Sequence, residues 1–183
     1  DALPISNVIY IKVKNGYKYY SIYWVNIMKS RKKVATKSKY IGNIQVVPHE
    51  DKMVYEDLAN NKVYATSPDH VLNFGGSTKL CLLAIDSNDK VYVGEADSNN
   101  EVYKLHYGIL GGNWQTISLN KPVSKDHLFV TAIGKVYIND NIKCTVTEIK
   151  TSKETIYKGK FLQAYSDGIA SLSDGNLVKT PFN

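Results

Sequence analysis

The sequence lacks the short motifs that commonly mark a catalytic or metal centre. Its two cysteines, Cys81 and Cys144, have no C-x-x-C spacing, and its four histidines form neither H-x-x-x-H nor H-E-x-x-H. No G-x-S-x-G pattern is present, and the Gly75–Thr78 run lacks the lysine of a P-loop. We therefore expect no metal and no cofactor. The absence of these motifs favours a protein without catalytic activity. If the protein is an enzyme, it must assemble its active site from distant strands.

Long hydrophobic runs are absent as well. The longest apolar stretch, Lys79–Ile85, has the length of a strand, so no membrane span is expected. The chain starts at Asp1 without a methionine, which predicts a mature end left by signal-peptide removal; a trimmed chain is the alternative. We expect a secreted, extracellular protein. In that oxidising setting Cys81 and Cys144 could form one disulfide, the alternative being two buried thiols.

Helical periodicity is nearly absent, and short runs rich in Val, Ile and Tyr follow polar turn clusters along the chain. Examples are Lys62–Tyr64, Lys90–Tyr92, Glu101–Tyr103 and Lys135–Tyr137. Asn, Asp and Gly accept the geometry of tight turns, and β-branched and aromatic residues fit a pleated sheet. About 15 short strands with connections too short for parallel crossovers predict an all-β, mostly antiparallel fold. A sandwich, a barrel, a trefoil-like arrangement or a small propeller-like fold would satisfy this pattern.

The length of 183 residues fits one domain, 1–183, with a candidate sub-boundary near residues 48–52. Next to that boundary, Glu50–Leu58 fits a short helix after Pro48, and Met53–Leu58 fits a strand equally well. Charge also changes there. Residues 1–49 hold nine basic residues and one acid, whereas residues 50–183 hold 14 lysines and 16 acids. The positive charge of the protein therefore belongs to its N-terminal quarter, a distribution typical of contact with polyanions or of a solvated lysine-rich surface.

The N-terminal quarter contains a strong hairpin signal at Asn15-Gly16, between two β-rich runs. A two-residue turn would pair Lys14 with Tyr17, Lys12 with Tyr19, and Tyr10 with Ser21. One face would then be apolar, and the other would combine aromatic rings with ammonium groups. The predicted aromatic–basic face, extended by the basic run that follows, comprises Tyr10, Lys12, Lys14, Tyr17, Tyr19, Tyr23, Lys29, Arg31, Lys32 and Lys33.

Rings beside cations suit two kinds of ligand. They can stack on sugar faces or on the bases of a single strand, while the ammonium groups meet sulfate or phosphate. Nucleic acid is a less suitable ligand for a secreted chain. A glycan or another polyanion is therefore the expected ligand of this face. In the alternative interpretation, the lysine stems cover the tyrosine rings and the face binds nothing.

A second candidate site lies further along the chain. The stretch Ala84–Ala96 reads as a small residue, an acid, a polar turn and a strand with the sequence Tyr-Val-Gly-Glu-Ala. It resembles a DM9 repeat, the module of secreted insect and mollusc proteins and of natterin-type proteins, although the Pro-Gly that precedes the family's lysine is absent here. Some DM9 proteins are mannose-binding lectins. The resemblance implies that Asp86, Glu101 and Lys104 contact a sugar.

Together these features predict a secreted, β-rich binding module that recognises glycans or polyanionic surfaces. Two alternatives remain open. Fourteen tyrosines and many strands would also suit a structural protein that assembles into homo-oligomers, and an enzyme could build its site only through the fold.

Overall fold

The structure is a computed structural model that describes residues 8–15, 19–26, 31–33, 40–50, 52–66, 70–76 and 79–183. In these residues the regular structure is β, apart from one 3₁₀ turn, Lys125–His127. The all-β prediction is therefore confirmed. The described part contains no helix that is long and apolar enough to cross a membrane.

The chain forms two compact units, residues 1–82 and 83–183, and the boundary falls within one strand. The strands that begin in the first unit are β1 (Val8–Asn15), β2 (Tyr19–Asn26), β3 (Arg31–Lys33), β4 (Ile41–Val46), β5 (Met53–Asp57), β6 (Lys62–Ala65), β7 (His70–Val71) and β8 (Lys79–Ile85). The second unit continues with β9 (Val91–Ala96), β10 (Glu101–Gly108), β11 (Trp114–Ser124), β12 (Leu128–Val130), β13 (Val136–Asp140), β14 (Thr145–Glu148), β15 (Glu154–Ile156), β16 (Lys160–Ala164), β17 (Gly168–Ser173) and β18 (Asn176–Pro181).

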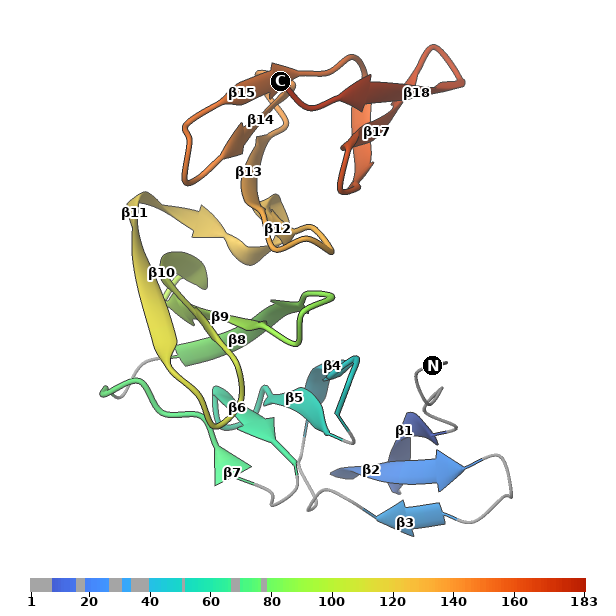
Figure 1. Cartoon of the computed structure of the whole chain (residues 1–183), viewed down its shortest axis with the longest axis vertical. Coiled ribbons are helices and arrows are strands. Elements are labelled where there is room, and N and C mark those ends of the chain that lie inside the picture. Colours follow the sequence, from blue (N-terminus) through green and yellow to red (C-terminus); the bar gives the residue numbers. More distant parts are fainter. Residues whose placement is uncertain are drawn as a thin grey trace. The chain divides into compact units, whose positions relative to one another are not determined.

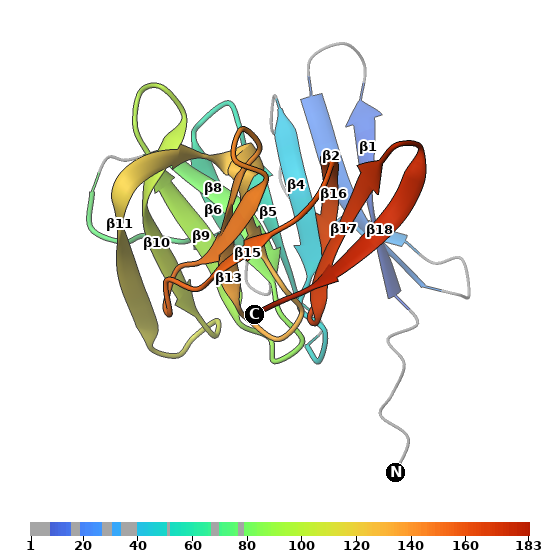
Figure 2. The same cartoon turned by 90° about the horizontal axis from the view of Figure 1, so that it is seen from above.

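These strands form five sheets, and each sheet uses only strands that follow one another in the sequence (Figure 1). The orders are β1-β2-β3, β4-β5-β6-β7, β11-β10-β9-β8, β12-β13-β14-β15 and β16-β17-β18, the last seen in red in Figure 2. The pairs whose register is resolved are antiparallel, as in β9 with β10 and β13 with β14. Successive small meanders of this kind are the organisation of β-propeller blades.

The turns that create these meanders lie where the polar clusters predicted them. Asn61, Asp89 and Asn100 adopt positive φ angles of 55°, 62° and 65° at the hairpin tips. Asn and Asp tolerate this left-handed conformation better than other residues with a Cβ atom, because their short polar side chains bond to the local backbone. The backbone N–H groups of Asn88 and Lys90, for example, donate to Asp86 Oδ1.

The helix considered for Glu50–Leu58 does not form. Met53–Asp57 is instead the buried strand β5, which pairs with β4 on one side and β6 on the other. Tertiary pairing overrides the acidic helix-start signal here, since both edges of the strand are satisfied by neighbours and Met53 and Tyr55 pack in a core cluster with Ile41.

The first hairpin has a register that differs from the predicted one. Lys14 pairs with Tyr20, Lys12 with Ile22, and Tyr10 with Trp24. The strands end at Asn15 and resume at Tyr19, so three residues separate them instead of two. The predicted pairs of Lys12 with Tyr19 and of Tyr10 with Ser21 are therefore wrong.

This register also changes the predicted aromatic–basic face. Tyr19 pairs with Asn15 and Tyr23 with Ile11, so neither stands opposite a lysine of β1. In the basic run that extends this face, Arg31, Lys32 and Lys33 form β3, which pairs with β2. Two further members of the predicted face, Tyr17 and Lys29, lie outside the described residues.

Tyr137 in β13 gives the second unit a pH dependence. Its ring is 2% exposed and stacks on Phe182 at 4.3 Å between centroids. Burial, followed by the negative charge of Glu148, raises the pKa of Tyr137 from 10.0 to about 12. Because the folded state holds this proton more tightly than the unfolded state, stability is complete below pH 10 and is lost as pH rises through 12.

We expect Tyr137→Phe, which has no proton to lose, to reduce this alkaline loss of stability. Urea unfolding measured between pH 9 and pH 12 would show a shallower fall of the unfolding free energy in the variant than in the wild type. Equal slopes in the two proteins would show that the Tyr137 hydroxyl does not control alkaline unfolding.

Candidate functional site

An irregularity in the β10–β11 pairing creates a hollow in the second unit. Val102 pairs with Val123 and Lys104 with Ser118, so a single residue of β10, Tyr103, stands opposite the segment 119–122 of β11. β11 is an edge strand, and Pro122 cannot donate a backbone hydrogen bond to a neighbour. The segment therefore leaves the ladder, as β-bulges do at sheet edges.

A buried polar network lies directly beside this bulge. Glu95 accepts hydrogen bonds from the Tyr103 hydroxyl at 2.8 Å and contacts His106 Nε2 at 2.9 Å. The other ring nitrogen, Nδ1, lies 2.9 Å from the Thr116 hydroxyl, and the Lys104 ammonium is 3.5 Å from Glu95. Burial and then the hydrogen bond to Glu95 raise the pKa of Tyr103, so the phenol stays a donor. The network thus fixes β9, β10 and β11 around the bulge.

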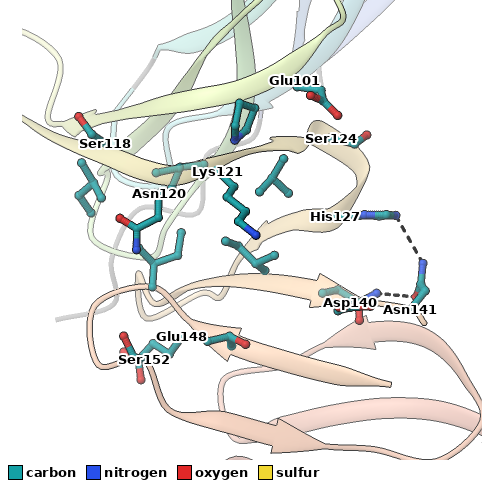
Figure 3. Close-up of a pocket in the computed structure, with 18 of the residues that line it drawn as sticks. Glu101, Ser118, Asn120, Lys121, Ser124, His127, Asp140, Asn141, Glu148 and Ser152 are labelled. Carbon is teal, nitrogen blue, oxygen red and sulfur yellow. Dashed lines mark hydrogen bonds between the residues drawn. The ribbon is translucent and has the colours of Figure 1, made fainter. Parts of the chain in front are cut away.

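The segment 119–122 forms one wall of a cleft whose other wall comes from β13 and β14 (Figure 3). The cleft has a volume of about 710 Å³, within the range of roughly 300–1,000 Å³ that is usual for small-ligand pockets. Six aliphatic residues contribute to its lining: Ile117, Leu119, Val123, Ile138, Ile142 and Ile149. Ile142 is 96% exposed and stands at the surface with no cover of its own.

Polar side chains are added to this aliphatic lining from both walls. Asn120 and Lys121 come from β11, and Asp140, Asn141 and Glu148 come from the opposite wall (Figure 3). Amide, carboxylate and ammonium groups supply both donors and acceptors at the surface of the cleft.

Several of these polar groups are held in place by hydrogen bonds. The Asn139 amide donates to Asn141 Oδ1 at 2.7 Å, and the Tyr157 hydroxyl donates to Asn139 Oδ1 at 2.8 Å. Asn141 Nδ2 lies 3.5 Å from His127 Nε2, a contact drawn as a dashed line in Figure 3. The amide groups are thus oriented before any ligand arrives, which reduces the entropy cost of binding.

Asp140 gives this part of the cleft a persistent negative charge. Its Oδ1 atom accepts backbone hydrogen bonds from Lys143 and Ile142, both at 3.0 Å. The bond from Lys143 is the main cause that lowers the pKa of Asp140 below its ordinary value. The lining also includes Glu101 and Glu148, against the single lysine Lys121. Lys135 lies 3.8 Å from Glu148 and Lys143 lies 4.0 Å from Asp140, so the cleft and its surroundings offer a strongly anionic ligand no excess of positive charge.

The three residues that the DM9 resemblance implies have different environments. Asp86 is 2% exposed, and its oxygens accept hydrogen bonds from the turn backbone and from the Tyr92 hydroxyl. Lys104 is ion-paired with Glu95. Glu101 is the member of this set that lines the cleft. Because Val91 pairs with Gly108 and Ala96 with Val102, the turn holding Asp86 and the turn preceding Glu101 lie at opposite ends of β9.

The other chemistry-bearing residues are dispersed. His127 lines the cleft, His106 belongs to the buried network, and His70 lies exposed on β7. Within the described residues, no group of three or more His, Cys, Asp or Glu side chains could hold a metal ion. Cys81 and Cys144 are thiols in the structure and do not form the disulfide considered from the sequence.

Comparisons with known proteins identify the fold and no family. No family model matches the sequence, and no curated protein matches it. Among solved structures, a streptogramin B lyase is similar with a TM-score of 0.52 and 9% identity, over 99% of this chain and 70% of that chain. A catalytically inactive histidine-to-alanine variant of virginiamycin B lyase from Staphylococcus aureus, with quinupristin, has a TM-score of 0.55 and 8% identity, over 94% and 73%. At these identities the likeness concerns the fold alone.

Proposed function

We propose that the protein is a binding module that recognises a neutral carbohydrate in the cleft between β11 and the strands β13 and β14. The observation that carries the proposal is the composition of this cleft, in which pre-oriented amide and carboxylate groups are set into aliphatic walls. Sugars present the same combination, with hydroxyl groups at the rim of the ring and C–H groups on its faces.

The polar groups suit ligands that carry hydroxyl groups, because each can replace its hydrogen bond to water by a comparable hydrogen bond to a ligand hydroxyl. Asn120 and Asn141 are exposed and offer both a donor and an acceptor. The carboxylates Asp140 and Glu148 add acceptors, and hydrogen bonds to charged groups are stronger than neutral ones. Ile142 and Leu119 cover apolar faces of the ligand, which releases water from both surfaces.

The charge of the cleft narrows the ligand class to uncharged sugars. Three acids and one lysine line it, and Lys135 and Lys143 pair with two of the acids, so a sulfated or uronic-acid chain would find no excess of positive charge there. A neutral sugar differs from the polyanion that was expected to bind the N-terminal quarter of the sequence. It agrees with the expectation that the ligand is a glycan. An extracellular location, also part of the proposal, would bring the module into contact with such glycans.

The proposal predicts that two exposed asparagines contribute directly to affinity. We expect Asn120→Ala and Asn141→Ala each to weaken the binding of a neutral tetrasaccharide by about 5- to 10-fold, the loss of about one hydrogen bond. Calorimetric titration with cellotetraose, mannotetraose and chitotetraose would measure it. Asn88→Ala is the matched control, because Asn88 is exposed in a turn outside the cleft.

Two results would contradict the proposal. Either none of the three sugars binds to the wild type at millimolar concentration, or the two cleft variants bind as tightly as the Asn88→Ala control. Unchanged urea midpoints in all variants would show that any loss of affinity is local to the cleft.

The fold shared with the lyases gives a second candidate, lyase activity, because His127 lines the cleft and histidine is a common acid–base residue. Incubation of the protein with quinupristin, followed by mass spectrometry, separates the two candidates. We expect no conversion. Conversion by the wild type that is lost in His127→Ala would replace carbohydrate binding by lyase activity.

A further inference from the structure

Two lysines and one tyrosine form a separate cluster at the opposite end of β10. The ammonium nitrogen of Lys150 lies 5.1 Å from the centroid of the Tyr107 ring, and that of Lys90 lies 5.8 Å from the same centroid. Lys90 immediately precedes β9, whereas Lys150 follows β14. The two positive charges are 60 positions apart in the sequence, and the tertiary structure brings both to the same ring.

The ring that gathers these charges is firmly held. Tyr107 is 8% exposed and stacks on Tyr92, with 5.6 Å between centroids and an interplanar angle of 8°. The Tyr92 hydroxyl in turn donates to Asp86 Oδ2 at 3.0 Å and contacts the Gly134 carbonyl oxygen at 3.1 Å. Because the ring is already held in place, it does not have to be ordered when a ligand binds beside it. This reduces the entropy lost on binding.

Beside this ring the structure contains a second pocket of about 490 Å³. Its lining combines Lys90 and Tyr107 with Gln115 and the glycine-rich loop 108–113. The loop turns through a hydrogen bond from Gly112 N–H to the Ile109 carbonyl oxygen at 2.9 Å, and Gly111 has a φ angle of 76°. No atom lies within 4 Å of the position that a Cβ of Gly111 would occupy, so this side of the loop is open.

The charges of the cluster are uncompensated. Within the described part of the chain, no carboxylate forms an ion pair with Lys90 or Lys150. Both ammonium nitrogens lie within 5.8 Å of the same ring centroid, so they repel each other, and an anion bound near them would relieve that repulsion. Lysine meets oxyanions as a point charge, without the planar geometry that arginine imposes.

We infer that the pocket lined by Lys90, Tyr107 and the loop 108–113, with Lys150 next to the Tyr107 ring, binds an oxyanion, and that this oxyanion is the sulfate group of a sulfated sugar. The Tyr107 ring offers an apolar surface next to the charges, and Gln115 and Asn113 add amide groups for sugar hydroxyls. This inference does not rest on the proposed function, because the cleft between β11 and β13–β14 and this pocket have no lining residue in common.

The test is a titration of ¹⁵N-labelled full-length protein with galactose 6-sulfate, galactose and inorganic sulfate, followed by amide chemical shifts. We expect the amides of Gly111, Gly112 and Asn113 to shift with galactose 6-sulfate and not with galactose. Weaker binding of inorganic sulfate than of the sulfated sugar would identify the sugar as part of the ligand. Tighter binding of inorganic sulfate would overturn the sugar assignment.

Lysine variants make the test specific. Lys90→Met and Lys150→Met keep the length of the side chain and remove the charge, and we expect each to weaken binding about 3-fold and the double variant about 10-fold. Lys158→Met is the matched control, since Lys158 is exposed and lies outside the pocket. Equal affinity in the double variant and the control would overturn the inference. Failure of the neutral sugars to bind in the cleft would leave these shifts at Gly111–Asn113 unaffected.

Discussion

Replacing Glu95 by alanine is expected to destabilise the second unit by about 3 kcal/mol, because a buried network would lose its shared acceptor. Glu95 is 7% exposed and accepts from Tyr103 while it contacts His106 and Lys104. Removing one partner of a buried charged pair leaves the other groups without compensation. A loss of this size is a large part of the roughly 5–15 kcal/mol that stabilises a typical domain.

The same substitution should also affect ligand binding, although Glu95 does not line the cleft. Its hydrogen bond to Tyr103 holds the residue that stands opposite the segment 119–122 of β11. Urea unfolding and calorimetric titration would measure the two effects. Glu95→Gln is the control, since it keeps the shape and one acceptor and is expected to lose less stability. Equal stability of Glu95→Ala and the wild type would contradict the role assigned to the network.

Glu56→Ala is expected to cost about 3 kcal/mol in the first unit, for a related reason. The Glu56 side chain is 2% exposed, and its two oxygens accept from the backbone N–H groups of Leu82 at 2.7 Å and Asn43 at 2.8 Å. Without the carboxylate, the buried N–H group of Leu82 and the partly buried N–H group of Asn43 lose their charged acceptor. The glycine at position 42 leaves room for this contact, because a Cβ there would collide with Glu56 Oε2.

Hydrogen exchange of the Asn43 and Leu82 amides would locate the effect, and urea unfolding would give its size. Both amides should exchange faster in Glu56→Ala than in the wild type. Asp174→Ala, a change at an exposed hairpin position, serves as the control and should leave both rates unchanged. Protection of both amides in Glu56→Ala would show that the carboxylate is not their essential partner.

The sequence was sufficient to predict the fold class, because turn chemistry and strand composition agree along the chain. Asn61, Asp89 and Asn100 adopt the left-handed conformation in the turns that their clusters indicated. Register was less predictable. The Asn15-Gly16 signal favours a two-residue turn, yet a longer separation pairs Tyr10 with Trp24. The observed register differs from the one that the local turn signal favours, and no pattern in the sequence specifies which of the two forms.

The candidate site could not be predicted for a related physical reason. In an unbroken ladder, the pairing of Ala96 with Val102 would continue to Glu95 with Tyr103 and put His106 on the opposite face. The bulge shifts Lys104 to Glu95 and thereby places His106 on the same face as Glu95. Pro122 and the polar pair Asn120-Lys121 interrupt the alternation of β11 in the sequence, a signal that could have indicated the irregular wall of the cleft.

Of the three residues that the resemblance to DM9 repeats implies, Glu101 lines the cleft. Asp86 matches the pattern for a reason of local structure, because an acid at the start of a tight turn accepts hydrogen bonds from the turn backbone. Turn geometry and ligand contact select the same residue types, so the sequence pattern alone does not separate them.

The central claim, that the cleft between β11 and the strands β13 and β14 binds neutral sugars, has one direct test. The ¹⁵N-labelled protein would be titrated with cellotetraose, mannotetraose and chitotetraose while amide chemical shifts are followed. The account predicts saturable shifts for at least one sugar, concentrated at Asn120, Lys121 and residues 140–142. An absence of shifts with all three sugars at millimolar concentration, or shifts confined to residues outside the cleft, would contradict it.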